Sequence, residues 1–156
     1  MARACILRRL NPGLTLDSTR PRSTPSVVVV EDDPSLLRAL TFALEAEGLS
    51  VHSYRAGKAL LSSPVHADCL VVDYRLPDLD GLSLIAALRE KGVSSPAILT
   101  TTNPDQRTRR LAAAAGVAIV EKPLLTSELR QRIDELIEGE PRRSISGLWE
   151  PPAIPM

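Results

Sequence analysis

Short apolar runs alternate with longer amphipathic stretches through the central part of the chain. Residues 27–30 are four consecutive valines, and such a short β-branched run is typical of a strand buried on both faces of a sheet. Four later segments have a similar character, although they are less uniform. The predicted strands are residues 27–30, 50–54, 69–72, 97–101 and 117–120.

The stretches between these runs carry the signals of helices. Asp33-Pro34 combines a residue that favours the N-cap with a proline in the first turn, and Asn103-Pro104 repeats the device. The apolar residues that follow the first of these signals at helical spacing are Leu37, Leu40 and Leu44. The predicted helices run from Asp33 to Gly48, over 58–61, over 82–90, from Asn103 to Gly116, and from a cap at Thr126 or Ser127 through Leu129 and Ile133.

Five strands that alternate with five helices predict an α/β domain. Parallel neighbours in a sheet need right-handed crossover connections, which helices supply on both faces. We therefore predict a doubly wound, five-stranded parallel sheet over residues 26–138. In such sheets the ligand site lies beyond the carboxyl ends of the strands, where the winding reverses. The residues directly after each strand are the candidates for chemistry.

Acidic and other polar residues stand at these strand ends. Glu31 and Asp32 follow the first strand, Asp73 follows the third, Thr101 ends the fourth and Lys122 comes after the fifth. Crowded carboxylates raise one another's pKa unless a cation neutralises them, and oxygen ligands with room for water and phosphate suit Mg²⁺. A carboxylate beside such a metal can accept a phosphoryl group as an aspartyl phosphate. The pattern thus favours a magnesium-assisted phosphoryl-transfer site.

Other polar residues near the strand ends have structural explanations. Asp33 is better explained as a helix cap than as a metal ligand, and Thr100 as a packed strand residue. Asp78 and Asp80 are interpreted as loop residues that favour turning. The candidate site therefore consists of the strand-end residues alone.

Charge and composition separate the two ends of the chain from its centre. Residues 1–25 hold five arginines against one aspartate, whereas residues 26–138 hold 12 basic and 16 acidic residues, a net charge of −4. Both ends contain several prolines and no apolar periodicity, which predicts a disordered basic leader over 1–25 and a Pro-rich tail over 139–156. Two cysteines make no disulfide framework and no apolar run is long enough to span a bilayer, so we expect a cytoplasmic protein.

Four motifs together resemble the receiver domains of bacterial two-component response regulators. They stand in the family's order at the corresponding strand ends and cover about residues 26–138. The motifs are VVVEDDP at 28–34, LVVDYRLPDLDG at 70–81, PAILTT at 96–101 and EKP at 121–123. The resemblance implies a flavodoxin-like fold with strand order 2-1-3-4-5. It also implies that the chain accepts a phosphoryl group from a sensor histidine kinase or a histidine phosphotransfer protein.

The resemblance assigns the acidic residues to two tasks. It implies that Asp73 is the phosphoacceptor and that Asp32 is a direct ligand of Mg²⁺, with Glu31 acting through water. The backbone carbonyl of Arg75 would be a further ligand. The implied metal site therefore comprises Glu31, Asp32, Asp73 and Arg75.

The resemblance also implies how a phosphoryl group would be sensed. Thr101 takes the place of the hydroxyl that moves towards it, and Lys122 that of the lysine that pairs with it, through a cis Lys122-Pro123 bond. Ile119 and Thr102 depart from the family, which usually has an aromatic residue and a small residue there. Because Ile119 is β-branched and stiff, we expect a smaller activation change, on the face of the fourth helix, fifth strand and fifth helix. A downstream partner or a second subunit would dock on that face.

The predicted function is a single-domain response regulator, a signalling protein rather than an enzyme. The 18 residues after the last helix are too few for a DNA-reading domain, so we expect no direct DNA binding and no membrane contact. One alternative is a degenerate receiver that docks on partners independently of phosphorylation, although all reactive positions are filled. Another is a haloacid-dehalogenase-like phosphatase, which expects Asp-x-Asp after its first strand and a cap domain.

Overall fold

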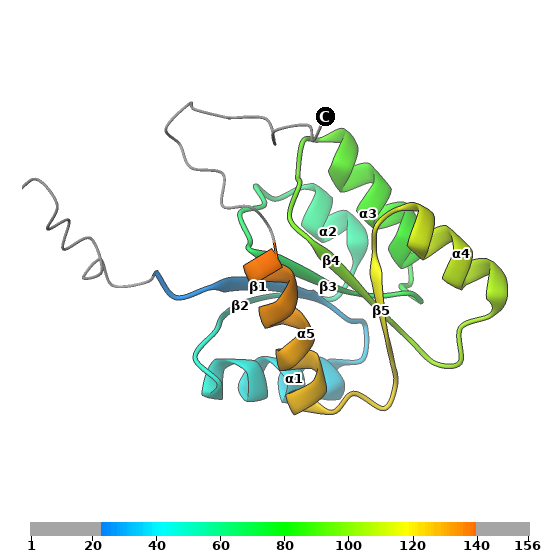
Figure 1. Cartoon of the computed structure of the whole chain (residues 1–156). Coiled ribbons are helices and arrows are strands. Elements are labelled where there is room, and N and C mark those ends of the chain that lie inside the picture. Colours follow the sequence, from blue (N-terminus) through cyan, green and yellow to red (C-terminus); the bar gives the residue numbers. More distant parts are fainter. Residues whose placement is uncertain (1–22, 140–156) are drawn as a thin grey trace, which may run out of the picture.

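Five parallel strands form one sheet in the order β2-β1-β3-β4-β5, which confirms the predicted flavodoxin-like topology (Figure 1). The computed structural model describes residues 23–139. The order of the sheet reverses between β1 and β3, so the first strand has the second on one side and the third on the other. The strands are β1 (Ser26–Val30), β2 (Ser50–Tyr54), β3 (Cys69–Asp73), β4 (Ala97–Thr101) and β5 (Ala118–Glu121).

Five helices cover the two faces of the sheet. One face carries the first and last helices, and the other carries the remaining three (Figure 1). This arrangement follows from the crossover connections, each of which must return the chain to the same end of the sheet. The helices are α1 (Pro34–Ala46), α2 (Gly57–Leu61), α3 (Gly81–Glu90), α4 (Gln106–Ala114) and α5 (Thr126–Gly139).

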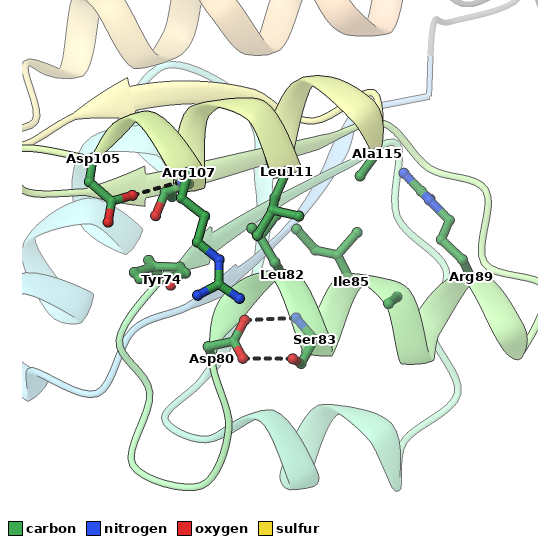
Figure 2. Close-up of a pocket in the computed structure, with 12 residues that line it drawn as sticks. Tyr74, Asp80, Leu82, Ser83, Ile85, Arg89, Asp105, Arg107, Leu111 and Ala115 are labelled. Atoms are coloured by element: carbon green, nitrogen blue, oxygen red, sulfur yellow. Dashed lines mark hydrogen bonds between the residues drawn. The ribbon is translucent and has the colours of Figure 1, made fainter.

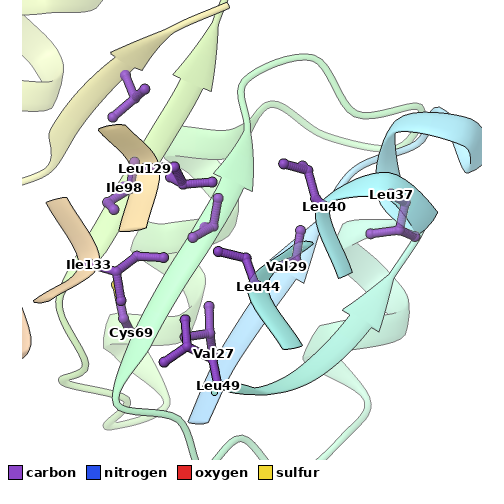
Figure 3. Close-up of a cluster of buried hydrophobic side chains, with 12 residues drawn as sticks. Val27, Val29, Leu37, Leu40, Leu44, Leu49, Cys69, Ile98, Leu129 and Ile133 are labelled. Carbon is purple, nitrogen blue, oxygen red and sulfur yellow. The ribbon is translucent and has the colours of Figure 1, made fainter. Parts of the chain in front are cut away.

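The alternation of side chains along the strands creates two cores. In β1, Val27 and Val29 point towards α1 and α5, whereas Val28 and Val30 point towards α2 and α3. Figure 3 shows the first of these cores, in which aliphatic side chains of both helices meet the strands. Its members include Val27, Val29, Leu37, Leu40, Leu44, Cys69, Ile98, Leu129 and Ile133. The predicted inward stripes of the first and last helices are therefore confirmed.

Two predicted helix caps are wrong, by two residues at α4 and by one or two at α5. The fourth helix begins at Gln106 rather than at Asn103, because the carboxylate of Asp105 accepts a hydrogen bond from the Thr108 N–H at 2.7 Å and caps it. Asn103 has φ 47°, in the left-handed region, so it cannot adopt the extended backbone of an N-cap. The last helix begins at Thr126 itself, with Leu125 accepting its first backbone bond, and neither Thr126 nor Ser127 precedes it as the cap.

The ends of the described segment are tied into the fold. The carbonyl of Pro25 accepts a hydrogen bond from the Ser50 N–H at 2.9 Å, and Gly139 is the last residue of α5. The rest of the predicted leader, 1–22, and of the predicted tail, 140–156, lies outside the described residues. Between residues 23 and 139, none of the helices has the length and apolar character needed to cross a membrane.

The cap of α1 generates a testable prediction. The Asp33 carboxylate accepts hydrogen bonds from the N–H groups of Ser35 at 2.8 Å and Leu36 at 3.1 Å. We expect Asp33→Ala to lower the free energy of unfolding by about 1 kcal/mol, because it removes both acceptors, and Asp33→Ser to retain most of it. The measurement is urea denaturation. The dependence of the free energy of unfolding on urea concentration should be the same in the variants and the wild type. Equal losses in the alanine and serine variants would show that the cap does not carry this stability.

Candidate functional site

The strand-end residues gather at the carboxyl edge of the sheet, where the C-terminal ends of all five strands lie. Backbone hydrogen bonds fix their positions there. The N–H of Glu31 donates to the Tyr54 carbonyl at 3.0 Å, beyond the end of β1, and the N–H of Lys122 donates to the Thr101 carbonyl at 2.8 Å, beyond the end of β5. Because the strands are parallel, residues far apart in the sequence become neighbours at this edge.

Three carboxylates form the centre of the site. One side-chain oxygen from each of Glu31, Asp32 and Asp73 lies within 4.8 Å of the others. We call these three residues the carboxylate cluster. Glu31 and Asp73 are only 2% and 5% exposed, whereas Asp32 is exposed to solvent. Burial of unpaired carboxylates costs free energy, so this cluster requires a compensating cation.

Lys122 supplies part of that compensation. Its Nζ donates to the Glu31 carboxylate at 2.8 Å and lies 3.3 Å from a carboxylate oxygen of Asp73. The lysine side chain is 21% exposed, so these ion pairs are largely shielded from solvent. The Lys122-Pro123 peptide bond is cis, as predicted. The structure therefore places the predicted lysine against two members of the cluster.

The pKa values of Glu31 and Lys122 respond to this crowding. Burial raises the pKa of Glu31, the hydrogen bonds from Lys122 and from the Asp33 N–H only partly offset it, and the charge of Asp73 raises it further. For Lys122, burial acts to lower the pKa, but the hydrogen bond to Glu31 and the charge of Asp73 outweigh it and raise the pKa. Lys122 is thus held in its charged form, whereas the cost of burying the Glu31 carboxylate is only partly offset.

The composition of the site fits a divalent cation. Three carboxylates and one ammonium group leave a formal charge of −2, and all the ligand atoms of the cluster are oxygens. Mg²⁺ prefers oxygen ligands, keeps several waters and is usually bound through one or two carboxylates. The exposure of Asp32 leaves the cluster open to solvent on one side. Asp33 does not belong to the cluster, because its carboxylate caps α1 as predicted.

Two predicted site residues, Thr101 and Arg75, lie at the end of β4 and in the loop after β3. Thr101 is buried at the end of β4, next to β5. Arg75 is exposed in the loop after β3 and pairs with Asp80 in a short antiparallel bridge. The functions of the Thr101 hydroxyl and the Arg75 carbonyl stay predictions. Thr100 is buried opposite Asp73, and this agrees with its interpretation as a strand residue.

In the loop between β3 and α3, sequence reasoning missed the role of Asp80 as a helix cap. Asp80 caps α3 by accepting from the Ser83 N–H at 2.9 Å and the Ser83 hydroxyl at 2.6 Å. A Cβ atom at Gly81 would lie 2.5 Å from the carbonyl oxygen of Asp73, so only glycine fits there. An aspartate just ahead of a predicted helix is an N-cap signal, and Asp80 stands two residues before the predicted helix over 82–90.

A groove of about 530 Å³ lies between α3 and α4 (Figure 2). Tyr74, the residue after Asp73, lines one end of it, and Leu82, Ile85 and Leu111 provide apolar walls. The guanidinium of Arg107 reaches across the groove towards α3 (Figure 2). The groove contains none of the predicted site residues.

Comparison with known proteins agrees with these features. The chain is 35% identical over 106 residues to the transcriptional regulatory protein FixJ of Azorhizobium caulinodans, covering 66% of this chain and 50% of FixJ. It is 34% identical over 125 residues to nodulation protein W of Bradyrhizobium diazoefficiens, covering 78% of this chain and 55% of that protein. The chain therefore corresponds to about half the length of these curated relatives.

Solved structures show the same fold. The receiver domain of the Francisella response regulator 1452 matches with a TM-score of 0.69 and 25% identity, over 74% of this chain and 98% of that domain. The structure described as FixJ-N matches with a TM-score of 0.67 and 27% identity, over 73% and 94% of the two chains. The family described as response regulator receiver domain matches residues 27–134, which include the whole carboxylate cluster and Lys122. The chain thus belongs to the receiver domains of two-component response regulators.

Proposed function

We propose that this receiver accepts a phosphoryl group on Asp73 in a Mg²⁺-dependent reaction, from a sensor histidine kinase or a histidine phosphotransfer protein. The observation that carries the proposal is the environment of Asp73. Its carboxylate stands at the end of β3, 5% exposed, within 4.8 Å of the Glu31 and Asp32 oxygens and 3.3 Å from the ammonium of Lys122. Receiver domains are phosphoacceptor signalling modules that work with histidine kinases.

The chemistry of the step requires little beyond position and charge. A carboxylate oxygen of Asp73 attacks the phosphorus atom, and an acyl phosphate bond forms. The P–N bond of the phosphohistidine breaks, and its electron pair stays on the imidazole nitrogen. Because such transfers depend mainly on alignment and charge neutralisation, the protein needs no further covalent partner. Attack of water on the acyl phosphate later returns Asp73 to a carboxylate and releases inorganic phosphate.

We assign the metal to Glu31, Asp32, Asp73 and the backbone carbonyl of Arg75. When bound, Mg²⁺ neutralises charge on the carboxylates and on the phosphoryl oxygens. Lys122 pairs with Glu31 and Asp73 before transfer. In this proposal its ammonium pairs with a phosphoryl oxygen afterwards. The Thr101 hydroxyl, at the neighbouring strand end, donates to another phosphoryl oxygen in this proposal.

The signal is proposed to leave through protein contacts on the face formed by α4, β5 and α5. Few side chains hold α4 in place, because only Thr108 and Ala112 of this helix are buried. Leu125, between β5 and α5, remains 61% exposed beside this face. Ile119 of β5 is partly buried in the core beneath α4, where a shift of Thr101 can be transmitted. A downstream protein or a second copy of the receiver would dock here, without direct contact to DNA.

Phosphoryl transfer can be tested on the intact chain with acetyl phosphate as donor. With Mg²⁺, the wild type should gain one phosphoryl group, and Asp73→Asn should gain none because the amide is a poor nucleophile. Intact-mass spectrometry is the measurement. Asp68→Asn is the matched control, since Asp68 precedes the same strand at the opposite edge of the sheet and should label like the wild type. Labelling of Asp73→Asn would refute the phosphoacceptor. If the wild type does not label, a docking role independent of phosphorylation is favoured.

Lys122 should be needed for the response rather than for metal binding. We expect Lys122→Ala to bind Mg²⁺ at least as tightly as the wild type, because a competing cation has been removed from Glu31 and Asp73. With Mg²⁺ and beryllofluoride, amide shifts in nuclear magnetic resonance spectra should reach α4, β5 and α5 in the wild type. In Lys122→Ala these amide shifts should be confined to residues near the carboxylate cluster. In Lys122→Arg their extent should be intermediate between Lys122→Ala and the wild type. Shifts as widespread in Lys122→Ala as in the wild type would contradict this role.

A further inference from the structure

The loop that follows Asp73 is pinned at its base to the end of β3. The Gly81 N–H donates to the Tyr74 carbonyl at 2.8 Å, and Arg75 pairs with Asp80 in an antiparallel bridge. Asp80 is in turn fixed to the first turn of α3. The base of the loop is therefore set by β3 and α3, but these contacts leave the tip, residues 76–79, without an anchor of its own.

Asp78 anchors the tip to α2, a helix more than fifteen residues earlier in the chain. Its carboxylate oxygens accept hydrogen bonds from the N–H of Gly57 at 3.1 Å and the N–H of Lys58 at 2.7 Å. The residue at the N-cap of α2 is Ala56, which offers no side-chain acceptor. Asp78 thus satisfies N–H groups that the helix itself leaves without a cap, because free N–H groups at a helix start need an acceptor.

A close apolar contact reinforces this anchor. A Cβ atom added at Gly57 would collide with the side chain of Leu79, and Gly57 is buried. Leu79 also packs against the core formed under α2 and α3. The loop tip therefore meets α2 through one carboxylate and one leucine, and the fit depends on a glycine. We call Asp78, Leu79 and Gly57 the loop clasp.

The loop clasp bears on the metal site because Arg75, which belongs to the pinned base of the loop, is only three residues before Asp78. Arg75 and Pro77 are exposed, and Leu76 between them is half-buried against the core under α2 and α3. The orientation of the Arg75 peptide therefore depends on the bridge at the base, on the packing of Leu76 and on the loop clasp at the tip. We propose that Asp78 is a positioning residue, which presents the Arg75 carbonyl to Mg²⁺ by holding the loop against α2. This inference rests on the proposed function, in which that carbonyl is a ligand.

Metal binding measured by calorimetry tests the inference independently of phosphoryl transfer. Residues that orient metal ligands typically contribute 10–100-fold to affinity. For a single weakly held carbonyl we expect Asp78→Ala to raise the Kd for Mg²⁺ by about tenfold. Asp78→Asn keeps one acceptor oxygen, so its Kd for Mg²⁺ should lie between those of Asp78→Ala and the wild type. Gly57→Ala, which displaces Leu79 instead of removing the carboxylate, should weaken Mg²⁺ binding in the same direction.

A control separates loss of position from loss of a helix cap. Asp105 caps α4 at the same edge of the sheet but does not belong to the loop, so Asp105→Ala should lower stability and leave the Kd unchanged. Amide hydrogen exchange of residues 75–79 should accelerate in Asp78→Ala and not in Asp105→Ala. In acetyl phosphate reactions, Asp78→Ala should need more Mg²⁺ for half-maximal labelling and reach the wild-type rate at saturation.

The possible failures are distinguishable. If the wild type binds no Mg²⁺ or does not label, the proposed function fails. If the wild type binds Mg²⁺ and labels, yet Asp78→Ala, Asp78→Asn and Gly57→Ala all fold with the wild-type Kd, the positioning role of Asp78 is overturned and the proposed function stands. A Kd that rises equally in Asp105→Ala would also overturn it, because a general loss of stability would then explain the effect.

Discussion

The repulsion among three carboxylates at one edge of the sheet is the constraint on which the rest of this molecule depends. Glu31 and Asp73 are buried beside Asp32, and a single ammonium, that of Lys122, is shared between the two buried groups. A folded chain that tolerates this arrangement must hold the lysine in place and remain receptive to a second cation. Burial is the main cause of the raised pKa of Glu31, and the hydrogen bond from Lys122 only partly offsets it.

The parallel sheet makes the arrangement possible. The chain reaches the carboxyl edge at the ends of β1, β3, β4 and β5, and each time it places a polar residue in the last position of the strand or just after it. The two aliphatic cores on either face hold the strands in register, so the distances at the edge are fixed by residues that take no part in the chemistry. The loop after β3 adds a second level of control, because its shape is set by contacts with both α2 and α3.

Sequence reasoning succeeded where local patterns determine structure. The valine run of β1 and the leucine stripe of α1 identified their elements, and position after a strand identified the carboxylate cluster and Lys122. It failed at the start of α4, where Asn103-Pro104 and Asp105 offer competing caps within three residues, and only the backbone conformation decides between them. It also missed the bond between Asp78 and α2, since no periodicity reveals which distant N–H groups a loop carboxylate will meet.

Thermal unfolding with and without Mg²⁺ tests the charge balance of the carboxylate cluster most directly. At a concentration ten times its Kd, Mg²⁺ should stabilise the wild type by about 1.4 kcal/mol. Asp32→Ala should unfold without metal at the wild-type temperature or above, because one repelling charge is gone, and it should gain nothing from Mg²⁺. Equal stabilisation of both proteins by Mg²⁺, or a loss of stability in metal-free Asp32→Ala, would contradict a cluster whose charge a divalent cation balances.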